Sequence, residues 1–532
     1  MLAPLAAAGN AALLASMLPA WRAFRAALGD PARAQAGVLA RILGANGGAA
    51  FLREHGLGPG ASPRAFLERV PPRAYDGLLP WIERAAAGEP GVLSAAPVPL
   101  FQPSSGSAAA TKLVPYPAPL RDEFQRALRP WLADMTLRRP ALALGPAYWS
   151  VSPAAAGERR TAGGARIGFE DDAEYLGAAA RRLVEATLAV PSAVRHLQDL
   201  GAWRARTLQH LLRARELRLL SVWSPTFLTL LLAPLRDDPG PHLAALRDGA
   251  AAEGPLPPLA PAPARAREVE RALARGLQAV WPRLALVSAW ADGPSAAPAR
   301  DLEALLPGVP LEAKGLLATE AVVSIPFGGA RPAAVRSHYL ELELPGQGPV
   351  PLERWREGDE GSVVVTTGGG LWRYRLLDRV RVTGLLARTP TLEFVGKEDL
   401  VLDRCGEKLH EGFAARVLAG LGLGPGLAFL APDASGGPPA TTLYVARAAV
   451  GPGGAAPLGA RLEAALGESF HYLHCVRLGQ LAPARVYVVE GDAAAAYYEA
   501  CRRRGRRAGD VKPAALSRED GWTALLPGRY AG

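Results

Sequence analysis

The sequence predicts an α/β protein in which a large N-terminal domain of helices and β-sheets, part of it barrel-like, is followed by a small, mobile C-terminal α/β domain. At 532 residues the chain exceeds the length of one ordinary domain. Short β-type runs replace the helical patterns near residue 320, and helices alternate with strands again from about residue 400. We therefore predict domains over residues 1–396 and 397–532.

The first part of the chain is predicted to be helical. Residues 12–57 carry apolar side chains at helical spacing, and Gly44 and Gly47 close that pattern. The apolar start lacks the positively charged segment of a signal peptide, so we interpret it as a buried N-terminal helix. Residues 173–219 give the longest helical signal. These segments should supply helices of the large domain.

Strands are predicted where short β-type runs recur between glycine and proline turns. Residues 320–396 contain the runs AVVSI, SHYLELEL, GSVVVTT, LWRYRLL, RVRVTG and TLEFVG. Their spacing predicts a mostly antiparallel sheet. Beyond residue 400 the order is helix, strand, helix, strand, helix, with TTLYVARA and ARVYVVE as the strands. That order predicts the small α/β domain.

Charge and cysteine content narrow the class of protein. The formal charge is +10, which suits a polyanionic partner or a polyphosphate substrate. The one dense basic run, Arg502–Arg507, is interpreted as a solvated helix face, and without a nucleic-acid-binding motif we expect no nucleic-acid partner. Cys405, Cys475 and Cys501 lack CxxC spacing, which favours a reducing cytoplasm. No apolar stretch reaches the roughly 20 residues that span a bilayer, so no membrane association is expected.

The first candidate motif is PSSGSAAATK, residues 103–112, which follows a β-like run. Small hydroxyl residues around a glycine leave backbone N–H groups free to surround phosphate oxygens, and a lysine adds charge. The candidate phosphate ligands are Ser104, Ser105, Gly106, Ser107 and Lys112. The spacing of a Walker loop is absent. The alternative is a Ser/Gly-rich surface turn.

The second motif is LLATEA, residues 316–321, in which Glu320 follows the hydroxyl residue Thr319 just before a β-type run. Mg²⁺ prefers carboxylate and phosphate oxygens over nitrogen or sulfur ligands. Glu320 is therefore the candidate metal ligand beside the phosphates of a bound MgATP. The alternative is an exposed glutamate at a strand edge.

The third motif is TTGGGLWRYRLLDRVRVTG, residues 366–384. Three glycines followed by alternating aromatic and basic residues predict a tight hairpin. Asp378 would lie at the end of a strand, where a carboxylate can accept hydrogen bonds from the two hydroxyls of a ribose, and Tyr374 can pack nearby. A purely structural hairpin is the alternative.

The fourth motif is FVGKEDLVLDRCGEKLHE, residues 394–411, which spans the predicted domain boundary. A glycine followed by charged residues suits a hinge, because a few residues can absorb a large dihedral change. Lys408, on a glycine-led turn, could swing toward a phosphate. The alternative is an ordinary solvated lysine at the start of a helix.

These motifs, in this order, resemble the adenylate-forming enzyme superfamily and, more closely, the Gretchen Hagen family of acyl acid amido synthetases, the auxin-responsive promoter family. FQPSSGSAAATKLVP, GLWRYRLLDRVRVTG and TPTLEFVGKEDLVL are each similar to a segment of that family, and GDVKPAAL near Lys512 is similar to its terminal motif. The resemblance covers nearly the whole chain.

The resemblance implies an ATP-dependent ligase that adenylates a carboxylic acid with ATP and Mg²⁺ and passes the acyl group to an amine, commonly an amino acid. It implies phosphate binding by residues 104–107 and Lys112, nucleotide contacts by Thr319 and Tyr374, ribose binding by Asp378, and catalytic roles for Glu320 and Lys408. We expect a monomer. An acyl-CoA or other thioester ligase and a non-catalytic nucleotide-binding homologue are the alternatives.

The chain also departs from the family pattern. Ala108, Ala109 and Ala110 stand where a second glycine is usual, LLATE lacks the aromatic residue that often opens its motif, and residues 385–387 replace the family's Phe-His-Asn. The acyl pocket is not defined by the sequence: Trp223 and Phe227 are either its walls or core aromatics.

Overall fold

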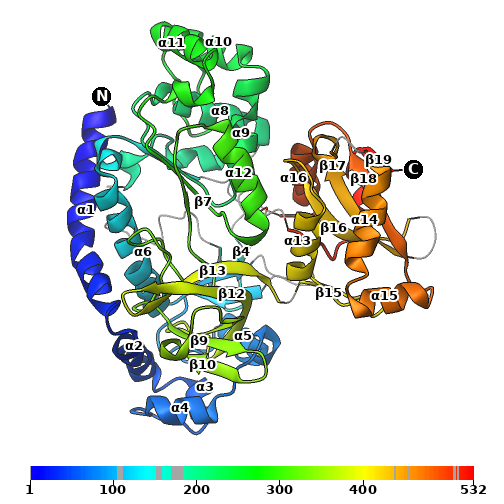
Figure 1. The fold of residues 1–532 in the computed structure, drawn as a ribbon. Helices are drawn as coiled ribbons and strands as arrows, with labels where there is room; N and C mark the ends of the chain where they lie inside the picture. The colour runs from blue at the N-terminus through cyan, green and yellow to red at the C-terminus, as the bar shows by residue number, and fades with distance from the viewer. Residues whose placement is uncertain are drawn as a thin grey trace.

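A computed structural model of the chain describes residues 2–104, 112–150, 159–168, 184–197, 199–398, 400–435, 439–451, 454–506, 511 and 514–531. The predicted division into a large N-terminal part and a small C-terminal part is evident in Figure 1, where the chain leaves the large part after β13. In the described residues, no helix combines the length and the apolar character needed to cross a bilayer.

The N-terminal segment forms three helices: α1 (Leu2–Ala27), α2 (Pro31–Asn46) and α3 (Ala50–Glu54). The Asp30 side chain caps α2 by accepting a hydrogen bond from the backbone N–H of Arg33, which is why the helix restarts there. The prediction that residues 12–57 are helical is confirmed, and the structure divides them among three helices. The expected burial of the first helix is wrong, because only part of α1 packs on the protein and Leu5 is exposed.

The chain then passes through η1 (Tyr75–Gly77) into a sheet with the order β2-β1-β5-β4. Two helices, α4 (Pro63–Arg69) and α5 (Leu79–Ala86), precede this sheet in the chain. The strands of the sheet are β1 (Leu100–Ser104), β2 (Lys112–Pro115), β4 (Arg159–Arg160) and β5 (Arg166–Ile167). β1 and β2 pair in antiparallel fashion across the first motif. Directly after β2 the long helix α6 (Ala118–Arg138) begins.

A second sheet, β3-β6-β7-β8, is parallel throughout. Its strands are β3 (Ala147–Trp149), β6 (Leu219–Ser221), β7 (Leu286–Ala289) and β8 (Leu311–Ala313). The helices of this region are α8 (Leu200–Arg213), α9 (Pro225–Asp237), α10 (Gly240–Asp248), α11 (Pro263–Leu273) and α12 (Ala296–Leu305). The helical signal over 173–219 is confirmed in its described part by α8, although a 3-10 turn (Ser192–His196) precedes this helix and the last residue of the segment begins β6.

The third sheet is the predicted antiparallel one, in the order β10-β9-β11-β12-β13. Its strands are β9 (Tyr339–Leu344), β10 (Gly348–Pro351), β11 (Glu360–Thr366), β12 (Tyr374–Leu386) and β13 (Thr389–Lys397). The runs LWRYRLL and RVRVTG form one strand, β12, rather than two. AVVSI is buried in the core but forms only isolated bridges, because apolar character predicts burial more directly than ladder pairing.

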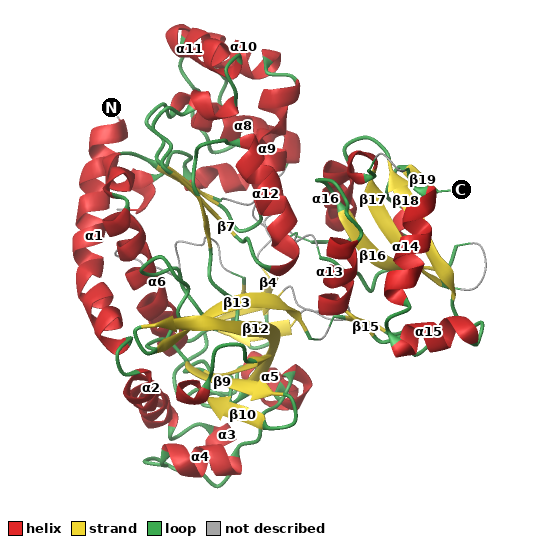
Figure 2. Ribbon diagram, in the orientation of Figure 1, coloured by secondary structure: helices red, strands yellow, loops and turns green. Residues whose placement is uncertain are grey.

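The small domain contains a mixed sheet, β16-β17-β18-β19, with helices packed on it (Figure 2). Its elements are β14 (Val401–Leu402), β15 (Leu409–His410), α13 (Glu411–Gly420), β16 (Ala428–Asp433), β17 (Ala440–Ala446), α14 (Ala456–Leu466), α15 (Phe470–Arg477), β18 (Ala482–Val489), α16 (Ala493–Arg503) and β19 (Gly528–Tyr530). The basic run is more than a solvated face: Arg504 and Arg506 pair with Glu519.

Candidate active site

The first motif lies on the β1–β2 hairpin. Ser104 ends β1, and its backbone lies opposite Lys112, the first residue of β2. Ser105, Gly106 and Ser107 lie outside the described residues. The described ends of the hairpin therefore fix where the chain enters and leaves the predicted phosphate loop, and the roles of its serines stay a prediction.

Lys112 and Glu320, from the first and second motifs, both act on Tyr75 of η1. The Tyr75 hydroxyl accepts a hydrogen bond from the backbone N–H of Leu113 at 2.8 Å, and Lys112 Nζ lies 5.7 Å from the centre of the tyrosine ring. Burial raises the pKa of Tyr75, and the Glu320 carboxylate is among the negative charges that add to the rise. The two motifs thus share one neighbourhood.

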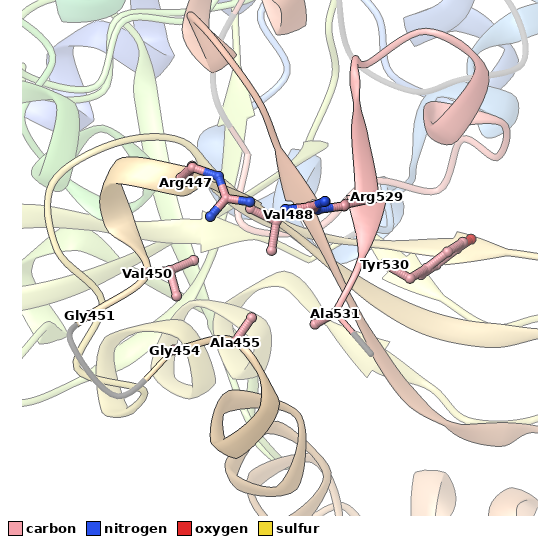
Figure 3. A pocket seen from close by; sticks show the side chains of 9 residues that line it. All are labelled: Arg447, Val450, Gly451, Gly454, Ala455, Val488, Arg529, Tyr530 and Ala531. Carbon is pink, nitrogen blue, oxygen red and sulfur yellow. The ribbon is translucent and has the colours of Figure 1, made fainter.

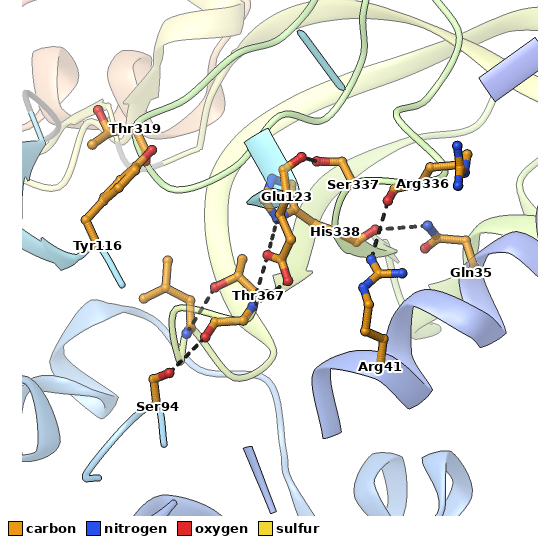
Figure 4. Close-up of polar contacts among 12 residues, drawn as sticks. Gln35, Arg41, Ser94, Tyr116, Glu123, Thr319, Arg336, Ser337, His338 and Thr367 are labelled. Carbon is orange, nitrogen blue, oxygen red and sulfur yellow. Dashed lines mark hydrogen bonds and ion pairs between the residues drawn. The ribbon is translucent and has the colours of Figure 1, made fainter. Parts of the chain in front are cut away.

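A second tyrosine joins the same two motifs. Tyr116, which follows β2, is buried, and its hydroxyl donates a hydrogen bond of 3.3 Å to the backbone carbonyl of Thr319 (Figure 4). Glu320 is itself buried, with 7% of its surface exposed. The alternative of an exposed strand-edge glutamate is therefore wrong for this residue.

The third motif reaches this neighbourhood through a short parallel bridge. Arg73, two residues before Tyr75, pairs with Tyr374: its N–H donates to the carbonyl of Arg373 at 3.0 Å, and its carbonyl accepts from the N–H of Arg375 at 2.9 Å. Tyr374 is buried at the start of β12. The segment around residues 73–75 therefore connects the first three motifs.

Asp378 lies within β12 rather than at the end of a strand. The pairing of β11 with β12 shifts register at this point, and Leu377 has a left-handed φ of 62°. The bulge changes which way the following side chain points. Asp378 is buried, and its Oδ1 accepts a bond of 2.7 Å from Lys397 Nζ.

Lys397 connects both domains. It lies opposite Asp378 in the β12–β13 ladder, and its backbone N–H donates to Oε2 of Glu411, the first residue of α13, at 3.1 Å. Burial raises the pKa of Glu411, and the hydrogen bond from Lys397 opposes that rise. Gly396, just before, has a φ of 159°. The predicted hinge is thus fixed on one side by Asp378 and on the other by Glu411.

Lys408 is exposed on the turn between β14 and β15, and its φ of 43° lies in the left-handed region. The turn is held by Glu407, a buried carboxylate that accepts hydrogen bonds from the backbone N–H groups of Arg404 and Cys405 at 3.0 and 2.7 Å. Within the described residues, no hydrogen bond or ion pair joins Lys408 to the other predicted site residues. Its delivery to the nucleotide stays a prediction.

A buried network that the sequence did not reveal holds the glycines of the third motif. Glu123 of α6, only 3% exposed, accepts hydrogen bonds from the N–H of Gly368 at 2.9 Å and from His338 Nδ1 at 2.9 Å (Figure 4). Ser94 donates to the carbonyl of Gly368 at 3.1 Å. A side chain on Gly370 would lie 2.5 Å from Leu93, so the loop tolerates only glycine there.

A hollow of about 550 Å³ in the small domain contains none of the predicted site residues (Figure 3). Arg447 and Arg529 line it, but both face Glu490, at 2.5 and 3.8 Å. Because that carboxylate offsets part of their charge and the hollow lacks every predicted site residue, we assign it no part in the site.

The residues present fit a magnesium ion held mainly by substrate phosphates. Mg²⁺ is usually bound through one or two protein carboxylates together with phosphate oxygens. Glu320 is the carboxylate predicted for this role, and it lies in the same neighbourhood as Lys112. Among the described residues, no group of three or more His, Cys, Asp or Glu side chains converges as a self-sufficient metal cage.

The architecture matches the fold of the adenylate-forming ligases. A solved 2-hydroxyisobutyryl-CoA ligase with bound 2-HIB-AMP has the same fold, with a TM-score of 0.50 and 14% identity over 86% of this chain and 85% of that chain. A narrower assignment follows from family models. The GH3 family N-terminal domain matches residues 20–311 and the GH3 family central domain matches residues 336–397, so the chain belongs to the GH3 family.

Individual relatives agree with this assignment and confirm the resemblance to the Gretchen Hagen family. An indole-3-acetic acid-amido synthetase GH3.8 of Oryza sativa subsp. indica is 26% identical over 433 residues, covering 72% of this chain and 69% of that protein. A probable indole-3-acetic acid-amido synthetase GH3.12 of Oryza sativa subsp. japonica is 27% identical and covers 74% of both chains. The structure of AtGH3.15 acyl acid amido synthetase in complex with 2,4-DB matches with a TM-score of 0.81, 18% identity and 97% coverage of both chains.

Proposed function

We propose that this protein is an acyl acid amido synthetase, which adenylates a carboxylic acid with MgATP and transfers the acyl group to an amine such as an amino acid. The observation that carries the proposal is the meeting of three motifs, from residues 112, 319–320 and 374, around the segment at Tyr75. Membership of the GH3 family supports it, because the matched relatives are amido synthetases.

In the first step a carboxylate oxygen of the acid attacks the α-phosphorus of ATP, and pyrophosphate leaves. The substrate is the nucleophile, so the protein's task is positioning and neutralising charge. Lys112 and the Mg²⁺ held at Glu320 would neutralise the polyphosphate, and Asp378 would hold the ribose once Lys397 releases it. Bound Mg²⁺ supplies Lewis-acid stabilisation of the phosphate oxygens.

In the second step the amine nitrogen attacks the acyl carbon, AMP leaves, and the nitrogen gives up a proton to solvent as the amide forms. We propose that rotation of residues 397–532 about Gly396 and Lys397 separates the two steps, with Lys408 serving the first. We also propose a monomer in a reducing cytoplasm, where Cys405, Cys475 and Cys501 would remain the free thiols seen in the structure.

Acid-dependent release of pyrophosphate from MgATP tests the proposal. A panel of aromatic and aliphatic carboxylic acids would be assayed with amino acids, with coenzyme A and with neither, and the products identified by mass spectrometry. Release that depends on an acid and ends in an amide is the expected result. A thioester formed only with coenzyme A would make the protein a thioester ligase, and no release with any acid would leave a nucleotide-binding homologue without catalysis.

A further inference from the structure

Four arginines gather where the first helices meet the segment that leads into β9. Arg33 and Arg41 lie on α2, Arg126 lies on α6, and Arg336 lies just before β9. Three of them, Arg33, Arg41 and Arg336, line a hollow of about 420 Å³. The fourth, Arg126, lies close enough for its charge to act on Arg41 and Arg336. Three segments that are far apart in the sequence thus bring positive charge to one place.

The charges of this arginine cluster are not neutralised by the protein. In the part of the chain that the structure describes, none of the four guanidinium groups forms an ion pair with a carboxylate. Among the described residues that line the hollow, Asp30 is the one carboxylate, and it accepts the backbone hydrogen bond that caps α2. The charge of Glu123 favours the protonated form of Arg41, but this carboxylate is buried and already bonded to His338 and Gly368.

The arginines repel one another. Burial lowers the pKa of Arg41, and the positive charges of Arg126 and Arg336 lower it further. Burial also lowers the pKa of Arg336, and the charge of Arg126 adds to that effect. A concave site lined by charge of one sign concentrates ions of the opposite sign. A bound anion would offset this repulsion, because each guanidinium would gain the negative partner that it lacks.

The arrangement of the arginines favours a phosphate group over a carboxylate. A carboxylate is planar and accepts hydrogen bonds through two oxygens, whereas the phosphate of a monoester offers three oxygens that face different directions. The arginines that line the hollow come from two separate elements, because Arg33 and Arg41 lie on α2 and Arg336 lies before β9. Guanidinium groups on several sides suit the tetrahedral group, and arginine is the residue that proteins use most for phosphate recognition.

The rest of the hollow suits the organic part of a small phosphate ester. Its remaining lining residues are short or apolar: Ala26, Ala27, Ala34, Gly37 and Val38. A Cβ added to Gly37 would meet no atom within 4 Å, so this face of α2 is open to a ligand. A concave site of this size fits a small molecule rather than a membrane surface or a nucleic acid.

The arginine cluster is joined to the glycines of the third motif. Nη2 of Arg41 lies 3.5 Å from the backbone carbonyl oxygen of Arg336 (Figure 4). Two residues further along the chain, His338 bonds to Glu123, whose carboxylate also accepts the N–H of Gly368. An anion that bridges Arg41 and Arg336 therefore stabilises the segment that positions the histidine partner of this carboxylate.

We propose that Arg33, Arg41 and Arg336 form a binding site for a small phosphate monoester, and that Arg126 adds to its positive charge. This site is separate from the predicted nucleotide motifs, and its existence does not depend on the proposed synthetase function. The ligand binds reversibly and undergoes no reaction there. Its binding stabilises the segment between Arg336 and β9, which is held by α2 and α6.

Isothermal titration calorimetry with phenyl phosphate, without ATP and at constant ionic strength, tests the site. We expect saturable binding to the wild-type protein. Binding should be weaker by about 10-fold or more in Arg41→Gln and in Arg336→Gln, the loss typical of a charge-assisted hydrogen bond. The matched control Arg267→Gln removes an exposed charge from α11 and should bind as the wild type does. Lys112→Met, in the predicted phosphate hairpin, should also keep the wild-type affinity.

Thermal unfolding distinguishes a loss of binding from a loss of folding. Arg336→Gln removes one of the mutually repelling charges, so its melting temperature without ligand should equal or exceed that of the wild type. Phenyl phosphate should raise the melting temperature of the wild type and of Arg267→Gln, because a ligand stabilises the folded state that binds it. It should not raise that of Arg336→Gln.

Four results would overturn the inference. The first is the absence of saturable binding to the wild-type protein, and the second is an equal loss of affinity in Arg267→Gln, which would show that only the overall charge matters. The third is binding that disappears in Lys112→Met and persists in Arg336→Gln, which would place the ligand in the phosphate hairpin. The fourth is benzoate binding through Arg336 with the same affinity, which would exclude selection of phosphate.

Discussion

At the scale of the residue, the ion pair between Asp378 and Lys397 makes the predicted ribose site testable. Asp378→Asn keeps the shape of the side chain and removes its charge. We expect the KM for ATP in acid-dependent pyrophosphate release to rise about 10-fold, because a charged hydrogen-bond acceptor is lost. Lys397→Met is the matched control: it removes a competitor for the carboxylate, so the KM for ATP should stay the same or fall. An unchanged KM in Asp378→Asn would exclude a ribose contact.

The backbone conformation of Lys408 allows its catalytic role to be tested by a substitution that does not lower stability. Its φ of 43° is a conformation that glycine adopts freely, so Lys408→Gly removes the amine while relieving local strain. We expect adenylation to slow by about 10²-fold to 10³-fold with no loss of melting temperature. Ala387→Gly, at the exposed β12–β13 turn with a φ of 55°, relieves similar strain and should leave the rate unchanged. Full activity of Lys408→Gly would show that the amine has no catalytic role.

At the scale of the element, α8 carries a histidine that makes stability depend on pH. Burial first, and then the charges of Arg206 and Arg213, lower the pKa of His210 from 6.5 to about 4. Between those values the unfolded chain binds a proton that the folded chain does not, so stability falls as pH drops from 7 toward 4. The shift corresponds to at most about 3 kcal/mol.

His210→Leu should therefore have nearly wild-type stability at pH 7 and exceed the wild type at pH 4.5. Chemical denaturation at the two pH values measures the difference. We expect this result because the Nε2 atom of His210 is buried with no hydrogen-bond partner among the described residues. An apolar replacement therefore leaves no polar group unsatisfied. If the free energy of unfolding changed with pH in the same way for both proteins, the lowered pKa of His210 would be contradicted.

The strands of the antiparallel sheet could be predicted because each carries its own local signal of β-type residues between turns. Local sequence patterns did not predict the structure where a segment depends on contacts with residues far away in the chain. AVVSI reads as a strand but forms no ladder, and α6 was missed although it is one of the longest helices. Glu123 looks like a solvated helix residue in RDEFQRAL, and only the fold brings it to Gly368, 245 residues away. The cluster of Lys314 with Trp131, Trp149 and Trp223 was equally hidden, because its members come from a helix and three strand ends that are far apart in the sequence.

At the scale of the whole molecule, the predicted hinge can be probed with two glycines on the same strand pair. Gly396 at the junction and Gly384 within the sheet have φ values of 159° and 145°, which side-chain-bearing residues rarely adopt. A Cβ at either position would meet no atom closer than 3.6 Å. Substitution by alanine should therefore cost each variant a similar 1–2 kcal/mol, roughly the penalty of a strained backbone.

Only Gly396→Ala should slow amide formation relative to adenylation, because only that residue would change its dihedral angles as the small domain rotates. Single-turnover measurements of adenylate formation and of its consumption by an amine separate the two rates. Equal effects of Gly396→Ala and Gly384→Ala on both rates would place the hinge elsewhere.

Lys397 makes two attachments. Its side chain bonds to Asp378 of the large domain, and its backbone N–H bonds to Glu411 of the small one. In the proposed ribose role of Asp378, a bound nucleotide would free the Lys397 side chain and leave only its backbone bond to Glu411. Occupancy of the nucleotide site would then be coupled to the orientation of residues 397–532. No separate sensor of bound ATP would be needed, because the residue at the proposed hinge would also line the nucleotide site.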